Sequence, residues 1–162
     1  MRIQTNKRPL GYGRVTARRA GIAQAALYLG ALAVLATGID HIQQYYSADY
    51  STVPTIGTLF FLNFVGAVVV AAGLVAPLSR VAGRYADAVR AVLAVGGIAL
   101  AVGSLAGLFI SESSSGLFGF QEHGYRTPIA LAIVAEAAAT FFLVVYLIAN
   151  GAGVPASRSR SD

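Results

Sequence analysis

The chain has 162 residues, of which 56% are hydrophobic and only 12% are charged, and its formal net charge is +5. A soluble protein carries roughly twice that charged share, so the composition excludes an ordinary water-exposed surface and favours a membrane protein. The chain contains no cysteine, which excludes disulfides, thiolate metal sites, iron–sulfur clusters and covalently attached c-type haem.

Four long apolar segments follow one another along the chain, at about residues 20–38, 56–78, 88–110 and 129–149. Each is close to the ~20 residues that a helix needs to cross about 30 Å of hydrocarbon. Because lipid offers no hydrogen bonds to the backbone, segments of this length are predicted to be helical. The expected fold is all-α, a four-helix transmembrane bundle made of two consecutive helical hairpins within residues 20–149.

The basic residues predict how this bundle is oriented in the membrane. Eleven of the twelve lie before the first span, between the second and third spans, or after the fourth span. Such residues collect on the cytoplasmic side, so both termini are predicted to be cytoplasmic. Residues 1–19 are then a basic cytoplasmic segment, and residues 150–162 are a disordered cytoplasmic tail. Because these charges lie where they meet anionic lipid headgroups, the lipid bilayer is the predicted partner and nucleic acid is not.

The two hairpins resemble each other at their outer ends. Asp40-His41 follows the first span, and Glu122-His123 lies in the loop that follows the third span. Each loop then reaches a Tyr-x-Thr-(x)-Pro pattern just before the next span. In this pattern the threonine is predicted to cap the returning helix, and the proline suits its first turn.

Polar residues also occupy matching depths in the returning spans. Asn63 lies seven residues after Ile56, and Glu136 lies seven residues after Ile129. At 1.5 Å per residue, both are ~10 Å below the outer boundary, close to the depth of Ser104 in the third span. Either the two halves form a parallel repeat with a site at its interface, or the two outer loops share residue types that any such loop would use.

Glu136 is singled out because an ionisable side chain inside a span costs at least ~2–3 kcal/mol. It is therefore predicted to face the bundle interior and to contact Asn63. That contact is either a helix–helix hydrogen bond without a ligand, or part of an outward-facing cavity in which Glu136 carries a proton or binds a cation. In the third span, Gly103-x-x-x-Gly107 predicts close helix packing. The complete predicted polar pocket consists of Glu136, Asn63, Ser104, Asp40, Tyr45 and Tyr125.

His41 and His123 are the only histidines, and both are predicted to lie on the outer side, beside Asp40 and Glu122. Together these four residues could hold zinc or another divalent metal. Alternatively, the two histidines could be the axial ligands of haem b. The spacing is diagnostic of neither cofactor, and the sequence favours no cofactor.

Residues 38–41, 50–63 and 119–125 resemble the corresponding parts of a group of small four-span membrane proteins from actinobacteria. The chain is also similar in size and topology to DoxX-like proteins. The resemblance implies four helices and a location in the bacterial plasma membrane, and it implies no activity. Lys7 is the only lysine among the basic residues, a bias typical of bacteria with GC-rich genomes.

The sequence has no glycine-rich phosphate loop, His-Glu-x-x-His motif or nucleophile elbow, so an enzyme is not favoured. Three classes of function remain. The first is a structural or accessory component of a membrane complex, with other membrane subunits or further copies of the chain as partners. The second is a binding or transport protein with an outward-facing pocket around Glu136 and Asn63. The third is a haem- or metal-binding redox protein that uses His41 and His123.

Overall fold

The structure of the protein, a computed structural model, describes residues 10–122, 124 and 126–151, with side chains from residue 15 onward. Within these residues four helices are long and apolar enough to cross a membrane, which confirms the predicted all-α four-helix bundle. The elements are α1 (Leu10–Ser47), η1 (Tyr50–Thr52), α2 (Ile56–Val75), α3 (Leu78–Val81), η2 (Gly83–Tyr85), α4 (Ala86–Ser111) and α5 (Thr127–Gly151).

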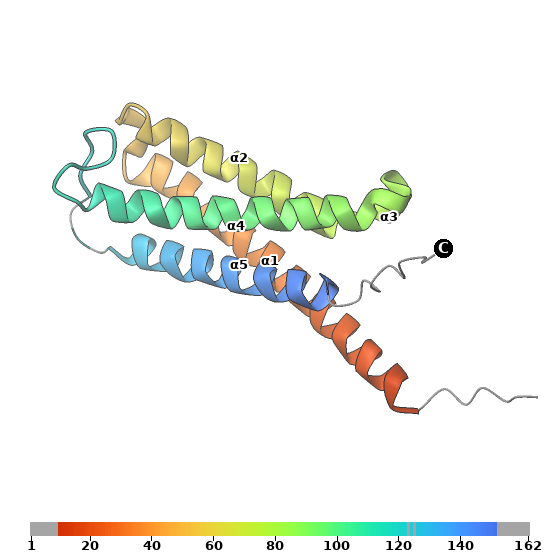
Figure 1. Cartoon of the computed structure of the whole chain (residues 1–162). Helices are drawn as coiled ribbons and strands as arrows, with labels where there is room; N and C mark the ends of the chain where they lie inside the picture. The colour runs from red at the N-terminus through yellow and green to blue at the C-terminus, as the bar shows by residue number, and fades with distance from the viewer. Residues whose placement is uncertain (1–9, 123, 125, 152–162) are drawn as a thin grey trace, which may run out of the picture.

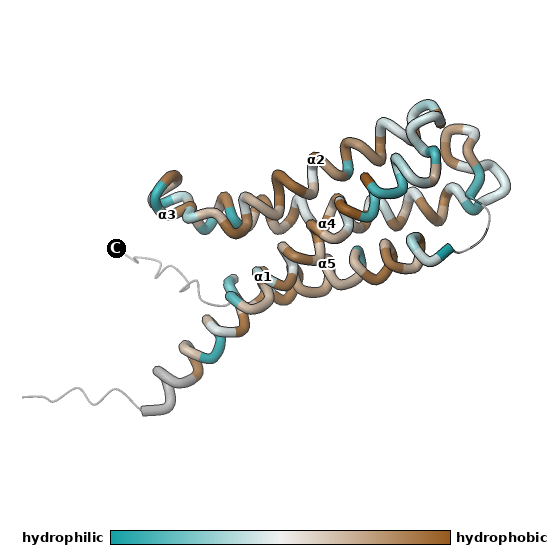
Figure 2. The backbone as a smooth tube through the Cα atoms, turned by 180° about the vertical axis from the view of Figure 1, so that it is seen from behind, coloured by the Kyte–Doolittle hydropathy of each residue, from teal (hydrophilic) through white to brown (hydrophobic). Residues whose placement is uncertain are grey.

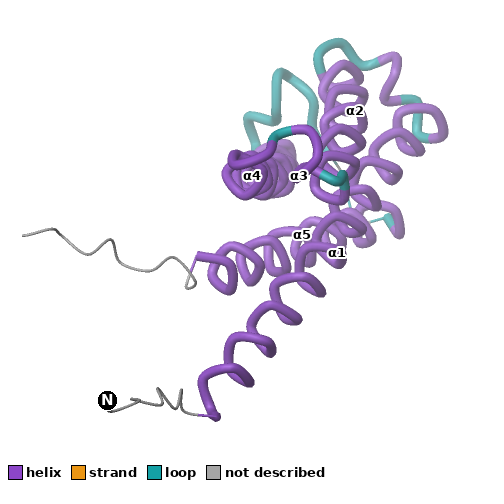
Figure 3. Tube along the Cα trace, turned by 90° about the vertical axis from the view of Figure 1, so that its right-hand side faces the viewer, coloured by secondary structure: helices purple, strands orange, loops and turns teal. Residues whose placement is uncertain are grey.

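The four long helices form a ring of neighbours. α1 packs along α5 and α2, and α4 packs along the same two helices. α1 and α4 therefore lie at opposite corners of the bundle, as do α2 and α5. Figure 1 shows the bundle from the side, and Figure 3 shows α4 end-on beside α2 and α5. We call the end that carries the α1–α2 and α4–α5 connections the loop end; α3 lies at the opposite end (Figure 1).

The outer faces of the helices are apolar, as a lipid environment requires. Each long helix exposes large hydrophobic side chains, for example Leu32, Val69, Val92 and Ile148. Figure 2 shows hydrophobic residues along the helices, with hydrophilic residues gathered at the loops and ends. Water would disfavour so much exposed apolar surface, whereas hydrocarbon solvates it.

Small residues bring the helix backbones close together in the middle of the bundle. A Cβ atom placed on Gly38 of α1 would lie 2.6 Å from Cβ of Ala67 on α2. One placed on Gly97 of α4 would lie 2.7 Å from Cδ1 of Leu143 on α5. Because lipid supplies no hydrophobic force between helices, this close approach is what stabilises their contact. The buried apolar core consists of Ala23, Ala26, Leu27, Ala31, Val34, Ala67, Leu74, Ala94, Ala101, Ala139, Leu143 and Tyr146.

The close packing predicted for Gly103-x-x-x-Gly107 was wrong. Among the described residues, no atom of another segment comes within 4 Å of a Cβ placed on Gly103. For Gly107 the nearest such atom is Cδ2 of Leu117, 3.5 Å away in the following loop. The tight contact of α4 with α5 is made instead at Gly97.

α1 is much longer than the predicted span of residues 20–38. It continues to Ser47, so the prediction that Asp40 and His41 lie outside the helix was wrong. The buried face of α1 repeats every three or four residues and does not stop where the hydropathy falls. Polar residues on this face bond inside the bundle, so the helix can continue. The buried face consists of Ala23, Leu27, Gly30, Val34, Thr37, His41 and Gln44.

The other three spans agree with the predicted boundaries to within three residues. α2 begins at Ile56, as predicted, and ends before Pro77, which cannot continue a helix. The predicted threonine cap was wrong for α2, because Thr55 and not Thr52 stands at the N-cap position, and its side chain makes no capping bond. Pro128 is the second residue of α5 and lies in the first turn, as predicted.

We expect Gly38→Leu to lower the free energy of unfolding by about 1–3 kcal/mol, because the new side chain would force α1 away from Ala67. Gly21→Leu on the same helix is the matched control, since a Cβ at Gly21 meets no described atom within 4 Å. Unfolding in mixed micelles, followed by circular dichroism, measures both. Equal stability of the two variants would contradict the close α1–α2 contact.

Candidate ligand-binding site

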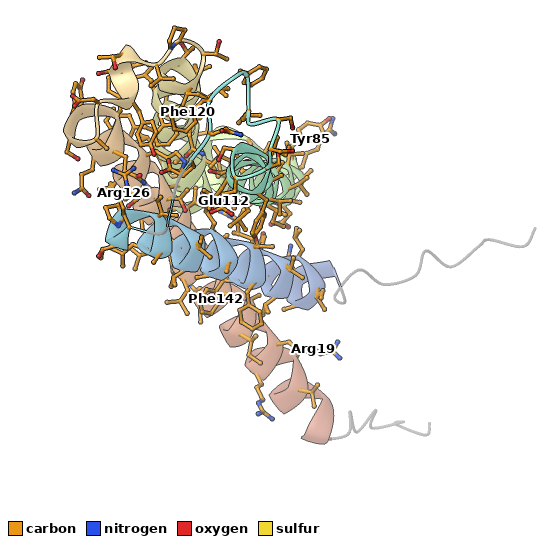
Figure 4. All side chains as sticks on the ribbon, turned by 90° about the vertical axis from the view of Figure 1, so that its left-hand side faces the viewer. Arg19, Tyr85, Glu112, Phe120, Arg126 and Phe142 are labelled. Carbon is orange, nitrogen blue, oxygen red and sulfur yellow. The ribbon has the colours of Figure 1, made fainter. Side chains whose placement is uncertain are left out.

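A cavity of about 430 Å³ lies among the four long helices at the loop end, a volume within the range of small-molecule sites. All four helices, η1 and the α4–α5 loop contribute to its lining. Figure 4 labels Phe120 of this loop and Arg126, which directly precedes α5; both lie at the loop end. The polar and aromatic lining residues are His41, Gln44, Tyr50, Phe60, Asn63, Ser104, Ser111, Phe120, Glu122 and Glu136.

Glu136 of α5 faces the bundle interior, as predicted, and is only 2% exposed. Its neighbours on the same helix face, Ala132 and Ala139, are small and buried. Atom Oε1 of Glu136 is buried and has no hydrogen-bond partner among the described residues, and Nε2 of His41 lies 4.0 Å from it. A buried polar atom without a partner costs free energy. The carboxyl group is therefore suited to bind a molecule that enters the cavity.

His41 of α1 is held through both ring nitrogens. Nδ1 donates to the carbonyl of Thr37 at 2.9 Å, and Nε2 lies 2.9 Å from Oγ of Ser104. Because a carbonyl can only accept, the proton of the neutral ring is on Nδ1, and the Ser104 hydroxyl donates to Nε2. The His41–Ser104 bond connects α1 to α4, across one diagonal of the bundle.

Asn63 of α2 lines the same cavity, but the predicted contact with Glu136 is not made as a hydrogen bond. In the described part of the chain, Oδ1 of Asn63 is buried and unpaired, like Oε1 of Glu136. The reason is the order of the helices: α2 and α5 occupy opposite corners, so the two side chains reach the cavity from opposite sides. Ile56 and Ile129, each seven residues earlier, also line the cavity as a matched pair.

Tyr50 fastens the α4–α5 loop over the cavity. Its hydroxyl donates to the carboxylate of Glu122 and accepts from Nη2 of Arg126, at 2.9 Å. The same Nη2 lies 3.5 Å from Oε1 of Glu122. The Tyr50 ring stacks on Phe60, with 4.5 Å between centroids, and meets Phe120 edge-on at 5.6 Å. Burial and the hydrogen bond to Glu122 raise the pKa of Tyr50, so its hydroxyl stays protonated and able to donate.

A second cavity, of about 280 Å³, adjoins this cluster. Tyr50, Phe120 and Glu122 line both cavities, whereas Val53 and Arg126 line only the smaller one. The three shared residues therefore form a partition between the two spaces.

The predicted polar pocket is partly assembled around the larger cavity. Glu136, Asn63 and Ser104 line it. Asp40 is buried but does not line it; its carboxylate accepts a hydrogen bond from Gln44, which does. The prediction that Asp40 lines the pocket was wrong because the residue was assigned to a loop. It belongs to helix α1, where it lies next to His41 in the sequence and therefore points in a different direction.

Tyr45 also lies outside the cavity lining, contrary to the prediction. Its ring packs against those of Tyr46 and Phe61, on the outer part of the α1–α2 contact. Residue 45 follows the buried Gln44, and successive residues of a helix point about 100° apart. The predicted roles of Tyr125 and His123 fall outside the described residues.

His41 and Glu122, two of the residues predicted to bind a metal ion or haem, both line the cavity. Within residues 10–122, 124 and 126–151, no group of three or more histidine, aspartate or glutamate side chains could hold a metal ion. Both nitrogens of His41 are already in hydrogen bonds. Because the predicted set also includes His123, which lies outside the described residues, the metal and haem interpretations stay predictions.

Several lining residues were missing from the predicted pocket. Gln44 lies three residues after His41 and Phe60 lies three residues before Asn63, so helical spacing from the predicted residues would have found both. The bonds of Tyr50 to Glu122 and Arg126 have no such signal, because the partners are more than 70 residues apart along the chain.

We expect Tyr50→Phe to loosen the α4–α5 loop while keeping the ring stack on Phe60. Losing about 1 kcal/mol of hydrogen bonding should speed amide exchange in residues 112–122 by about fivefold. Tyr46→Phe, at an exposed tyrosine near the same end of α1, is the control. Hydrogen-exchange mass spectrometry measures the exchange rate in both variants. Unchanged exchange in Tyr50→Phe would contradict the claim that the Tyr50 hydroxyl holds the α4–α5 loop in place.

Comparisons of the chain with models of known families, with curated proteins and with solved structures find no match. The expected relation to actinobacterial four-span proteins and to DoxX-like proteins thus stays a prediction.

Proposed function

We propose that this multi-pass membrane protein binds a small amphipathic molecule in the cavity at the loop end. The observation that carries the proposal is the pairing of a cavity of about 430 Å³ with two buried, unpaired acceptors, Oδ1 of Asn63 and Oε1 of Glu136. Most of the remaining lining is apolar, such as Ile56, Leu59 and Leu100. A ligand that matches both features has a hydrogen-bond donor at one end and an apolar body.

The chemistry of the acceptors supports a donor on the ligand. Each unpaired acceptor atom loses its hydration on burial and regains a hydrogen bond only when a donor reaches it. The Ser104 hydroxyl lies beside both Nε2 of His41 and the carboxyl group of Glu136, and its single proton can satisfy only one of these two acceptors. A ligand with an –OH or –NH group would complete the polar arrangement that the helices leave open.

The distribution of basic residues supports an orientation with both termini in the cytoplasm, and the resemblance to actinobacterial four-span proteins supports a bacterial plasma-membrane location. The loop end, and with it the cavity, would then lie on the outer side. In this orientation the ligand is met outside the cell or in the outer leaflet, which fits a binding protein or the binding step of a transporter.

The accessory-component interpretation stays a prediction and has one weakness. Polar contacts that serve only to hold helices together would be expected to pair with each other. Here the two polar side chains at matching depths, Asn63 and Glu136, reach a shared cavity without bonding to each other. A binding function accounts for this arrangement, and a purely structural one does not.

We expect n-decanol, which joins one hydroxyl donor to an apolar chain, to bind the protein saturably with a stoichiometry of one. Asn63→Leu should weaken this binding about tenfold, because it removes an acceptor and keeps a similar side-chain volume. Asn150→Leu, at an exposed asparagine near the end of α5, is the matched control. Native mass spectrometry of the protein in nanodiscs gives stoichiometry and affinity. Absent or non-saturable binding would overturn the proposal.

We expect Ser114→Cys in the α4–α5 loop to react with a membrane-impermeant maleimide in intact cells. Ser79→Cys in α3 should react only after the cells are permeabilised, because the two positions lie at opposite ends of the bundle. The chain has no native cysteine, so each variant carries a single reactive thiol. Labelling with the reverse preference would place the loop end in the cytoplasm.

A further inference from the structure

The cavity lining carries acidic groups without a matching fixed cation. Glu136 and Glu122 line it, and the buried Asp40 carboxylate is hydrogen-bonded to the lining residue Gln44. As far as the chain is described, no lysine or arginine lines this cavity. Arg126 pairs with Glu122 from the smaller cavity, and the neutral ring of His41 is the group that lies 4.0 Å from Glu136, so the described lining gives Glu136 no cationic partner.

Aromatic rings form part of the same wall. Tyr50, Phe60 and Phe120 all line the cavity, and the Tyr50 ring contacts both of the others. The faces of such rings carry partial negative charge and attract cations, most strongly where water is excluded. Carboxyl groups and aromatic faces thus favour the same class of ligand head, a positively charged one.

One side of the cavity opens between α2 and α4. Leu59 and Leu62 of α2, and Ala99 and Gly103 of α4, line the cavity and are nevertheless exposed. A Cβ placed on Gly103 would meet no described atom within 4 Å. These positions lie within membrane-spanning helices, so the surface beside this opening is in contact with lipid and not with water.

Farther from the loop end the same two helices close together. A Cβ on Gly66 of α2 would lie 2.8 Å from Cδ1 of Leu100, and one on Gly73 would lie 2.8 Å from Cδ1 of Leu93. α2 and α4 therefore touch in the part of the bundle farther from the loop end and separate at the level of the cavity. The opening is a lateral portal, which we define by Leu59, Leu62, Ala99 and Gly103.

We infer that the ligand is an amphipathic amine that enters from the bilayer through the lateral portal. Its ammonium group is held by Glu136 and Asn63, and its apolar part extends between α2 and α4 toward the lipid. An ammonium donates to both unpaired acceptors and also supplies the missing positive charge. This inference rests on the proposed binding function and narrows it to one class of ligand and one route.

The head-group requirement is tested with n-decylamine, n-decanol and decanoate, three probes with matched chains, in nanodiscs at pH 7. Affinities are expressed per mole fraction of probe in the bilayer, so that differences in how the probes partition from water into lipid do not affect the comparison. We expect decylamine to bind about tenfold more tightly than decanol, and decanoate not to bind, because bonds to charged groups are stronger than neutral ones. Glu136→Gln should abolish the preference for the amine, whereas Glu112→Gln, outside the cavity, should keep it.

The route is tested by the rate of decylamine binding in the same nanodiscs. Gly103→Phe should slow association about tenfold or more by filling the lateral portal, and Gly21→Phe, at an equally open glycine of α1, should not. Gly103→Leu is the smaller block to use if thermal unfolding shows the phenylalanine variant to be misfolded. If the amine instead came from water through the smaller cavity, Gly103→Phe would bind at the parent rate and Tyr50→Phe would bind faster.

The outcomes separate this inference from the proposed function. Saturable decanol binding that depends on Asn63, without a preference for the amine, would overturn the ammonium assignment and leave the binding function intact. An amine preference with an unchanged rate in Gly103→Phe would overturn only the route. If none of the three probes binds, the inference and the proposed function both fail.

Discussion

Hydrocarbon forms no hydrogen bonds, so each polar group within a membrane span must find its partner inside the bundle. In this protein the rule explains the order at the loop end, where two acceptors of the described residues depart from it. Thr37, His41 and Ser104 form a continuous set of hydrogen bonds from α1 to α4. The exception is the pair of unpaired acceptors on Asn63 and Glu136, which carry the cost that a ligand would remove.

The bundle divides along its length into a packed part and an open part. In the packed part, small residues such as Gly38, Gly66 and Gly97 bring backbones together. In the open part, α2 and α4 separate, and the space between them is bounded by polar and aromatic side chains. Tyr50 then closes the loop end through Glu122 and Arg126. A stable contact at one end thus allows a cavity at the other without loss of the fold.

The sequence predicted most of the fold, because hydropathy alone identifies segments that must be helical in lipid. The end of α1 could not be found in this way, since hydropathy falls at Asp40 and His41 although the buried face continues through Gln44. Glu136, Asn63 and Ser104 were correctly assigned to one polar layer from their depth. Their hydrogen-bond partners were not predicted, because the depth of a residue does not tell which helices are neighbours. The placement of α2 opposite α5 is a property of the assembled bundle.

The length of α1 has a structural consequence. Its 38 residues extend about 57 Å, well beyond the hydrocarbon thickness, and its first part stands clear of the other helices in Figure 1. One unbroken helix carries Arg18 and Arg19 on this exposed part and His41 beside the cavity. Along the helix, the imidazole ring lies about 33 Å away from Arg19. The helix that positions the His41 ring beside Glu136 is therefore the same one that presents Arg18 and Arg19 at its far end.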